Sequence, residues 1–398
     1  MKKWLFFLVV LLLIAAEILK VYFIMPFPGS QHANTIDIAY FLHQYIWWFR
    51  IIGWLAVLLL WFALWGTIGR WGKFGMIVGL LLYTLIFYFF NFRFLADKMF
   101  YQPRQKLLLS VTDNRVDSNA LVVGISINGV AKAYPIEIIG YHHQVQDTLG
   151  GQPIIMTYCT VCRTGRAYSP MMKGIYQQFR LVGMDHFNAM FEDEATHSWW
   201  RQASGEAIAG PLKGTALKEL PTQQMRLGAW VRGYPNTLIL QPDPAFAKQY
   251  KDLQGFDMGT INSGLEKRDT ASWKFKSWVV GIVVDGHTKA YDWNELLQQR
   301  IIQDTINGKN ILLLVEKDKA SFHAWNRQVK EQVLQFSLDE AYQTMKDSET
   351  NSVWNMEGIC IDGSLKGNQL LQIPAYQEFW HSWKSFHPGT RIYATNKE

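Results

Sequence analysis

Two cysteines at the spacing Cys-x-x-Cys form the most reactive pattern in this chain. Cys159 and Cys162 follow Ile154–Thr157, an apolar run rich in β-branched residues that predicts a strand. Two thiols at this spacing can close a disulfide or bind one metal ion, and both uses need the thiolate form. Arg163 and Arg166 lie just beyond the pair, and their positive charge favours the thiolate. Any chemistry of this chain is therefore expected to centre on this pair.

Four histidines are candidates to complete a metal site. His142 and His143 end a predicted short helix, Pro135–His142, where the helix dipole also favours a cation. His186 follows a predicted strand, and His197 lies in the run Thr196–Trp200 beside two tryptophans. Thiolate and imidazole together suit copper or zinc. The predicted metal ligands are Cys159, Cys162, His142, His143, His186 and His197.

Each of these residues also has a purely structural interpretation. The two cysteines could be small buried residues of a turn, and His186 could be a loop residue bonded to the backbone. Cys360, the third and last cysteine, is expected to be a buried free thiol. The acidic run Glu192–Glu194 is expected to form a solvated surface.

Composition and missing motifs exclude several classes of protein. Three cysteines in 398 residues are too few for a disulfide-dense scaffold, and the net charge of +6 is scattered, so no nucleic-acid partner is expected. The chain lacks the glycine-rich phosphate loops, the serine-hydrolase elbow and the His-Glu-x-x-His zinc motif. Nucleotide binding, serine hydrolysis and zincin chemistry therefore have no support.

The first hundred residues are typical of a membrane protein. Apolar runs at Trp4–Met25, Ile51–Gly69 and Phe74–Phe90 each approach the roughly 20 residues that cross a bilayer. A signal peptide is the alternative for the first run, but Ala15-Ala16 is a poor cleavage signal, so an uncleaved helix is expected. The sequence thus predicts three transmembrane helices, with the lipid bilayer as partner.

Basic residues predict how these helices are oriented. Lys2, Lys3, Arg70 and Lys73 flank the same side of the predicted bundle and favour a cytoplasmic position. The protein is therefore expected to be a multi-pass protein of the cell membrane, and the part beyond Phe100 is expected to be extracytoplasmic, either periplasmic or external.

The soluble part contains an internal repeat. Tyr134 matches Tyr291 and Gly151 matches Gly308, both at an offset of 157 residues. An Asn128-Gly129 or Asp285-Gly286 turn between two apolar runs predicts a hairpin in each copy. The expected architecture is a membrane-anchored α-helical bundle followed by a mainly β or α+β soluble part made of two duplicated lobes. The predicted domains are residues 1–100, 101–254 and 255–398.

The repeat also serves as an internal control. The second copy has Glu316 and Lys319 where the first has Cys159 and Cys162, and Asn351 stands opposite His197. Because the second copy keeps the frame and loses these side chains, we expect the chemistry in the first lobe.

Several motifs of this first lobe resemble one known family. They are Ala-Tyr-Pro at Ala133–Pro135, Thr-Tyr-Cys-x-x-Cys at Thr157–Cys162, Asp-x-x-Thr-x-Ser-x-Trp at Asp193–Trp200, and the run Ser204–Gly214. Together they resemble the bacterial family known as domain of unknown function 3179. That family typically has Pro-Leu between the two cysteines and glycine where His197 stands here. The resemblance supports the site and implies no activity.

Three functions remain open. The first is an extracytoplasmic Cys/His site that binds copper or zinc. The second is a thiol–disulfide oxidoreductase that uses the same cysteines; no helix is predicted to begin at Cys159 to lower its pKa. The third is a non-catalytic binding or assembly module in which the pair is structural. The sequence identifies no small-molecule or membrane partner beyond the bilayer.

Overall fold

A computed structural model describes residues 2–341 and 343–394 of the chain. These residues form two compact units. Unit 1 comprises residues 1–101 and 177–216, and unit 2 comprises residues 102–176 and 217–398. The segment that follows the cysteines by about fifteen residues therefore belongs with the N-terminal helices, although it is distant from them in the sequence.

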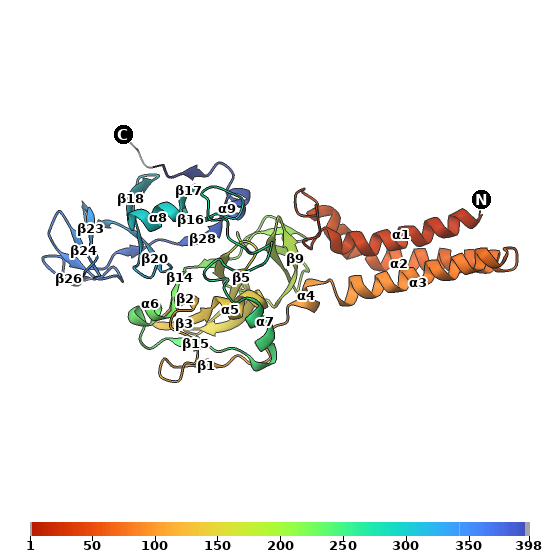
Figure 1. Ribbon diagram of the computed structural model, residues 1–398, viewed down its shortest axis with the longest axis horizontal. Coiled ribbons are helices and arrows are strands. Elements are labelled where there is room, and N and C mark those ends of the chain that lie inside the picture. The colour runs from red at the N-terminus through yellow and green to blue at the C-terminus, as the bar shows by residue number, and fades with distance from the viewer. Residues whose placement is uncertain (1, 342, 395–398) are drawn as a thin grey trace. The chain divides into compact units, whose positions relative to one another are not determined.

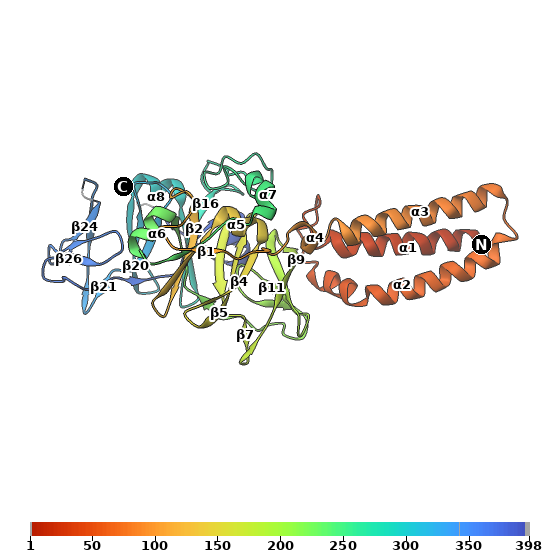
Figure 2. The same ribbon diagram turned by 90° about the horizontal axis from the view of Figure 1, so that it is seen from below.

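Unit 1 begins with three long apolar helices, which run alongside one another in Figures 1 and 2. The helices of this part are α1 (Lys2–Tyr22), α2 (Ile36–Trp65), α3 (Arg70–Phe92) and the short α4 (Ala96–Met99). By length and composition each of the three long helices could cross a membrane. The prediction of three apolar N-terminal helices is confirmed.

Helix α2 starts fifteen residues earlier than the apolar run that predicted it, at Ile36 instead of Ile51. No glycine or proline interrupts Ile36–Ile52, and Asp37 in the first turn suits the positive helix N-terminus. A helix of 30 residues is about 45 Å long, which exceeds the hydrocarbon layer of roughly 30 Å. The additional turns carry Tyr40 and His43, which pack against Trp199 of the unit 1 sheet.

A buried polar network joins the three long helices. Glu17 of α1 accepts hydrogen bonds from Arg50 Nε of α2 at 2.7 Å and from Asn91 Nδ2 of α3 at 2.9 Å. Lys20 Nζ donates to Asn91 Oδ1 at 2.6 Å. Polar groups in an apolar bundle are stable only when paired, so this network fixes the register of the helices.

A four-stranded antiparallel sheet completes unit 1. Its strands are β9 (Phe179–Asp185), β10 (Asn188–Asp193), β11 (Trp199–Arg201) and β12 (Ala207–Ala209), in the order β12-β11-β10-β9. The loop between α1 and α2 contacts this sheet, because Met184 N donates to Ile24 O at 2.8 Å. Gly183 faces the same carbonyl, and a Cβ there would lie 2.3 Å from it.

The first half of unit 2 holds two larger sheets and one small hairpin. The five-stranded sheet consists of β1 (Leu108–Leu109), β15 (Leu238–Leu240), β3 (Val130–Pro135), β2 (Leu121–Ile127) and β14 (Gln223–Arg226), in that order. The four-stranded sheet consists of β13 (Glu219–Leu220), β6 (Thr164–Tyr168), β5 (Gln152–Cys159) and β4 (Gln144–Leu149), and the small hairpin of β7 (Met171–Met172) and β8 (Ile175–Tyr176). The helices of this half are α5 (Ile136–His142), α6 (Leu227–Gly233), η1 (Pro244–Phe246) and α7 (Ala247–Asp252).

The second half of unit 2 is built in the same mainly β manner. One sheet consists of β28 (Ala375–Phe379), β16 (Trp278–Val284), β17 (His287–Asp292) and β29 (Arg391–Ile392), and another of β18 (Ile301–Ile306), β19 (Lys309–Val315), β20 (Phe322–Asn326) and β27 (Leu371–Gln372). The remaining strands are β21 (Gln328–Val329), β22 (Gln332–Val333), β23 (Phe336–Asp339), β24 (Thr344–Asp347), β25 (Val353–Trp354) and β26 (Cys360–Asp362), and the helices are α8 (Trp293–Gln299) and α9 (Trp380–Phe386). The prediction of a mainly β soluble part is confirmed.

Equivalent positions of the repeat make equivalent backbone pairs. The β2–β3 hairpin places Val123 opposite Tyr134, and the β16–β17 hairpin places Val280 opposite Tyr291. Each tyrosine hydroxyl donates to an aspartate: Tyr134 to Asp147 at 2.7 Å, and Tyr291 to Asp304 at 2.8 Å.

A tryptophan covers the first strand of each hairpin. A Cβ on Gly124 would lie 2.4 Å from the Trp230 indole, and one on Gly281 would lie 2.2 Å from Trp383. Both positions therefore need glycine so that the buried ring can lie on the backbone.

Candidate functional site

The cysteines lie at the tight end of the β5–β6 hairpin. Cys159 is the last residue of β5 and is paired with Thr164 of β6, and Cys162 lies in the loop that joins them. Both thiols are buried, and neither is in a disulfide in this structure. Arg163 closes the loop with a left-handed φ of 55°, a conformation in which a glycine would be unstrained. The pair therefore belongs to a β-hairpin and lies at no helix N-terminus.

Lys276 is a cation that interacts electrostatically with both cysteines. Its Nζ donates to the carbonyl of Val161, one of the two residues between the cysteines, at 2.7 Å. Burial lowers the pKa of Lys276 to about 8, and the negative charge that Cys162, Cys159 and Glu266 can carry opposes this effect. An ammonium group that interacts with both thiols favours their thiolate forms in turn.

His381 shares the same carbonyl. Its Nε2 lies 3.1 Å from Val161 O and 3.1 Å from Lys276 Nζ, and its ring stacks on Phe275 with centroids 4.2 Å apart. Burial, together with the Lys276 charge, lowers the pKa of His381 to about 3. The Nε2 atom of a neutral imidazole here can accept a hydrogen bond from Lys276 or donate one to the Val161 carbonyl, according to the tautomer.

Strand β28 of the second half covers the cysteine turn. Phe379 N donates to Cys162 O at 2.9 Å. One residue earlier, the buried Glu378 accepts from Arg166 Nη2 at 2.7 Å and from Thr164 Oγ1 at 2.8 Å. The two halves are thus joined by hydrogen bonds directly at the turn.

Arg163 is fully enclosed beside this cover. Its guanidinium donates to Gln377 Oε1 and to the carbonyl of Phe256 at 3.0 Å each, and lies 3.7 Å from the Trp278 ring centroid. A planar cation that is stacked and hydrogen-bonded in this way fixes the loop conformation. Arg163 therefore positions the cysteines, and its guanidinium group is held by Gln377, the Phe256 carbonyl and the Trp278 ring.

His142 and His143 have partners of their own in unit 2. His142 Nε2 bonds to the Tyr250 hydroxyl at 2.7 Å, and His143 Nδ1 bonds to the carbonyl of Tyr158 at 2.9 Å. Burial lowers the pKa of His143 to about 4. Arg300, the equivalent residue of the repeat, also has a left-handed φ and donates to Val315 O at 2.8 Å. The bond made by His143 is thus made at both positions and has a structural explanation.

His186 and His197 belong to unit 1. His186 Nδ1 lies 2.6 Å from Asp185, and this hydrogen bond raises the pKa of the imidazole. His197 has a left-handed φ of 56°, and Asn351 at the equivalent position of the repeat has one of 57°. The glycine that is usual in the family fits this conformation without strain.

In the part of the chain that the structure describes, no group of three or more His, Cys, Asp and Glu side chains could hold a metal ion. The ring nitrogens named above instead bond to a tyrosine, a carbonyl or a carboxylate. Of the six predicted ligands, Cys159, Cys162, His142 and His143 lie in unit 2, and His186 and His197 lie in unit 1.

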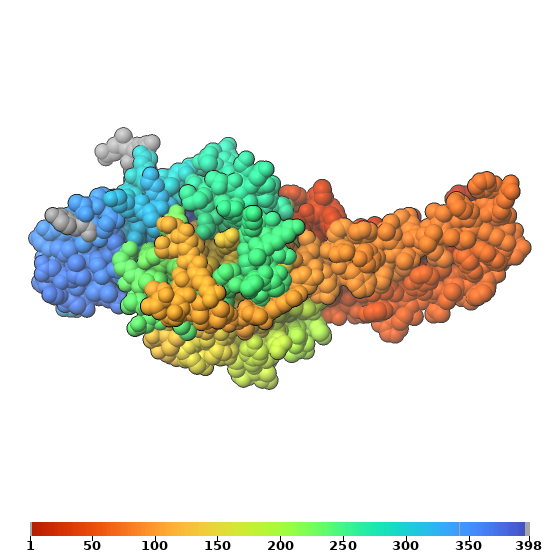
Figure 3. Space-filling model, turned by 60° about the horizontal axis from the view of Figure 1, so that its bottom comes forward, coloured from red at the N-terminus to blue at the C-terminus, as the bar shows by residue number. Residues whose placement is uncertain are grey.

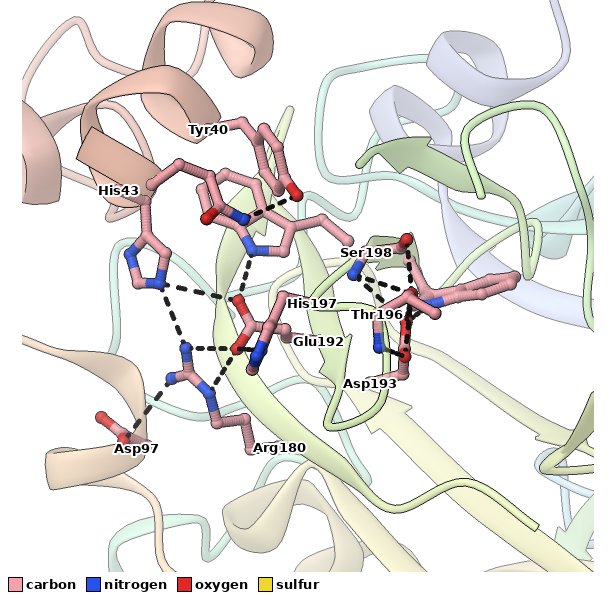
Figure 4. Close-up of polar contacts among 12 residues, drawn as sticks. Tyr40, His43, Asp97, Arg180, Glu192, Asp193, Thr196, His197 and Ser198 are labelled. Carbon is pink, nitrogen blue, oxygen red and sulfur yellow. Dashed lines mark hydrogen bonds and ion pairs between the residues drawn. The ribbon is translucent and has the colours of Figure 1, made fainter. Parts of the chain in front are cut away.

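The acidic run does not form a solvated surface, contrary to our expectation. Glu192 and Asp193 are buried in β10, and only Glu194 is exposed. Figure 4 shows Arg180, His43 and His197 around Glu192. Glu192 accepts from Arg180 Nε at 2.9 Å and from Trp199 Nε1 at 2.8 Å. Alternation of residues along the strand turned this carboxylate towards α2, which composition alone could not reveal.

The Asp-x-x-Thr-x-Ser-x-Trp motif is a structural cap. Asp193 accepts from the Thr196 backbone N at 2.7 Å and from Trp200 Nε1 at 2.9 Å (Figure 4). In the repeat, Asp347 accepts from Thr350 N at 2.6 Å and from Trp354 Nε1 at 2.9 Å. Since both copies close the same turn in the same way, the motif needs no catalytic explanation.

The sequence analysis missed Lys276, Glu378 and His381. They lie in the second half, where the loss of the cysteines had suggested no contribution to chemistry, and more than a hundred residues from Val161. Comparing equivalent positions of the two copies could not identify these residues, because a residue that contacts the other copy need not be present in both. The three residues reach the cysteine turn because β28 of the second half is hydrogen-bonded to it.

A comparison with protein-family models decides the family. The model described as "Protein of unknown function (DUF3179)" matches residues 104–390. The chain belongs to this family. The DUF3179 match confirms the resemblance seen in the motifs and extends it over the second half. No curated protein and no solved structure matches the chain. Membership of DUF3179 supplies no activity, so function is argued from the site.

Proposed function

We propose that this protein is a membrane-anchored thiol–disulfide redox protein whose Cys159 and Cys162 interconvert between a dithiol and a disulfide. The observation that carries the proposal is that two buried thiols share one hairpin turn, to which the Lys276 ammonium group is hydrogen-bonded. One thiolate attacks the disulfide of a partner molecule and forms a mixed disulfide. The second thiolate then displaces the partner sulfur, so the partner leaves as a dithiol and the pair is oxidised.

Lys276 provides the positive charge near the thiols that a helix N-terminus provides in other redox proteins. A thiolate is the attacking species, and a nearby cation lowers the thiol pKa. The bond from Lys276 to Val161 O holds the ammonium group against the turn in either redox state, because the backbone carbonyl does not change on oxidation. Reactivity also requires β28 to move, since both sulfurs are buried. Strand β28 therefore slows the reaction of the two cysteines with small oxidants in solution.

A copper or zinc site on the same thiols is the alternative, and it needs further ligands. Among residues 2–341 and 343–394, no group of three or more His, Cys, Asp and Glu side chains is placed to hold a metal ion. A dithiol alone provides two of the four ligands that zinc usually takes. This observation favours the redox proposal over the metal proposal.

We also propose that the unit 1 sheet lies outside the cytoplasm. Its contact with the α1–α2 loop places it at the end of the helices opposite Lys2, Lys3 and the α2–α3 loop. Basic residues favour the cytoplasmic side of a membrane, so the sheet belongs on the other side. Disulfides persist in such compartments, which is consistent with redox chemistry at the cysteines.

A tandem duplication is the origin that we propose for the two halves of the repeat. It is supported by the equivalent hairpin registers and by the equivalent Trp-to-Thr bonds, Trp230 to Thr237 and Trp383 to Thr390, both 2.9 Å long. In this account the second copy lost the thiols and came to cover the turn.

The test uses the full-length protein in detergent, equilibrated in thiol–disulfide buffers of stepped potential and then trapped by alkylation. Mass spectrometry should find a reversible Cys159–Cys162 disulfide that C159S and C162S abolish and C360S leaves intact. The pH midpoint of alkylation should move upward by about 1 pH unit in K276M, because a cation close to a thiol lowers its pKa by about that amount or more. K274M, at an exposed neighbouring position, is the matched control. Absence of the disulfide at every potential would refute the proposal.

A further inference from the structure

The second half of unit 2 contains a polar pocket of about 340 Å³ that the cysteine turn does not use. It is lined by residues 286–289 of the β16–β17 hairpin, residues 305–307 at the end of β18, and Pro388, Gly389 and Arg391 beside and within β29. Figure 3 shows the cyan and blue residues of the second half side by side on one face. The volume is within the range of roughly 300–1,000 Å³ typical of ligand sites.

Basic side chains share one face of the sheet at this pocket. His287 and Lys289 are two residues apart on β17, so their side chains project to the same face. Strand β29 pairs in parallel with β17, and Arg391 lies directly opposite Lys289. Opposite residues of neighbouring strands also project to the same face, and the strands are about 4.8 Å apart. Lys289 and Arg391 therefore line the pocket side by side, and His287 lines it next along β17.

The charges at the pocket leave one cation without a counter-charge. Lys289 Nζ lies 2.5 Å from Asp304 of β18, so this lysine is balanced. Arg391 forms no ion pair with any residue that the structure describes. None of the lining residues is acidic, and neither Asp285 of the turn nor Glu295 of α8 lines the pocket. Because like charges on opposite strand residues repel, an anion bound between Lys289 and Arg391 would stabilise their pairing.

The lysine of this pocket belongs to a frame that both halves share. In the first half, Lys132 Nζ lies 2.8 Å from Asp147. In the second half, Lys289 and Asp304 form the same pair. Since the ion pair is present at both equivalent positions, it has a structural role in each half.

The other two basic residues are present only in the second half. Val130 stands at the position equivalent to His287, at the common offset of 157 residues. Leu238 stands at the position equivalent to Arg391, because it lies opposite Lys132 in the same parallel pairing. The same local fold is thus built with aliphatic residues at both positions, so the fold does not require either basic side chain.

The pocket is accessible because β29 is an edge strand. In the first half the equivalent strand β15 is covered by β1, which places Leu108 opposite Leu240. In the second half β29 is the last strand of its sheet, and Arg391 is exposed. A solute can therefore reach the Arg391 side chain directly.

These donors suit a phosphate group. The guanidinium group of Arg391 can donate two parallel hydrogen bonds to two oxygens of an oxyanion. A carboxylate has only those two oxygens, whereas a phosphate monoester has a third terminal oxygen and a charge of about −1.5 to −2 at pH 7. Lys289 can donate to this third oxygen while it pairs with Asp304, since an ammonium group has several N–H donors. Ile306 and Pro388 supply apolar surface for carbon atoms attached to the phosphate.

We propose that this pocket binds a phosphate group, with Arg391 and Lys289 as donors to its oxygens and His287 as a further polar contact. The proposal does not depend on the redox function of the cysteines. A soluble phosphate ester, inorganic phosphate and a lipid headgroup share this chemistry, so the test contains a probe for each.

The test is isothermal titration calorimetry on the full chain in detergent, in buffer without phosphate or sulfate. The probes are glycerol 3-phosphate, inorganic phosphate and a short-chain phosphatidic acid, and glycerate is the carboxylate control. At least one phosphate probe should bind at a single site, and glycerate should bind at least about tenfold more weakly because it lacks the third oxygen. Binding of the phosphatidic acid alone identifies a lipid headgroup, whereas binding of glycerol 3-phosphate or inorganic phosphate identifies a soluble ligand.

Two variants carry the residues of the first half and should therefore fold. Arg391→Leu should weaken phosphate binding by at least about tenfold, because it removes charge-assisted hydrogen bonds, and His287→Val should weaken it less. Arg391→Lys keeps the charge without the planar fork and should fall between the parent and Arg391→Leu. Arg115→Leu, at an exposed position of the first half, makes the same change in net charge and should leave the affinity unchanged.

Three results would overturn the proposal. The first is that no phosphate probe binds at millimolar concentration. The second is that glycerate binds as tightly as the phosphates. The third is that Arg115→Leu weakens binding as much as Arg391→Leu, since the binding would then reflect overall charge. Near-ultraviolet circular dichroism of each variant verifies that an observed loss is not unfolding.

Discussion

The buried carboxylate of Glu378 offers the sharpest way to loosen the cover on the cysteines. Its two oxygens accept from Arg166 Nη2 at 2.7 Å, Thr164 Oγ1 at 2.8 Å and Ser382 Oγ at 2.9 Å. Glu378→Gln removes the buried one of the two carboxylate charges that face Arg166, the other being the more exposed Glu219, and leaves the shape of the side chain almost unchanged.

The magnitude follows from burial. The side chains of Arg166 and Glu378 are 3% and 1% exposed, so water cannot replace the lost partner. Removing one member of a buried ion pair destabilises a protein by about 3–5 kcal/mol. Since 1.4 kcal/mol corresponds to about a tenfold change in an equilibrium constant, opening at the turn should become at least about a hundredfold more frequent.

The assay measures alkylation of Cys159 and Cys162 in native buffer, where a buried thiol reacts only after local opening. Glu219→Gln is the matched control, because Glu219 pairs with the same Arg166 at 2.9 Å through a side chain that is 36% exposed. Exposed pairs contribute about 1 kcal/mol or less, so this variant should react less than about tenfold faster than the parent. Equal alkylation rates in the two variants would refute the reasoning that β28 gates the thiols.

Three further predictions follow from the fold. Gly281→Ala should lower the free energy of unfolding by about 2–3 kcal/mol, because the new Cβ would overlap buried Trp383, whereas Gly228→Ala should change it little; denaturant titration compares the two. The neutral state of buried His143 should contribute about 3 kcal/mol of stability that is lost as pH drops from 6.5 to about 4, because over that window His143 binds its proton only in the unfolded chain, and buried His381 should add to the fall; a chain whose stability is flat across this range contradicts the burial of neutral imidazoles. A phosphatase reporter joined to the C-terminus should be active and a cytoplasmic fluorescent reporter dark, and the reverse pattern would place the soluble part inside the cell.

Local patterns predicted much of the fold. Long apolar runs gave the three helices, and the Asn-Gly and Asp-Gly turns gave the β2–β3 and β16–β17 hairpins, because both signals depend on neighbouring residues alone. The shared offset also matched Tyr134 with Tyr291 in strands of the same kind.

Residues brought together by distant segments could not be predicted in this way. The carbonyl of Val161 meets Lys276 and His381 only because β28 lies over the turn, and Glu192 is buried only because α2 extends to Tyr40 and His43. Histidine is also ambiguous, since an imidazole that caps a backbone carbonyl and one that binds metal look alike in a sequence.

The most direct test of the central claim is the state of the cysteines in the membrane itself. Cells are acidified to stop thiol exchange, the membranes are alkylated, and the full-length protein is analysed by mass spectrometry and by elemental analysis on the same preparation. The redox account predicts a Cys159–Cys162 disulfide in a fraction of the chains that rises with an added oxidant and falls with dithiothreitol, with neither copper nor zinc bound in proportion to the protein. A pair that stays reduced under both treatments and carries one copper or zinc ion per chain, lost in C159S, would contradict it.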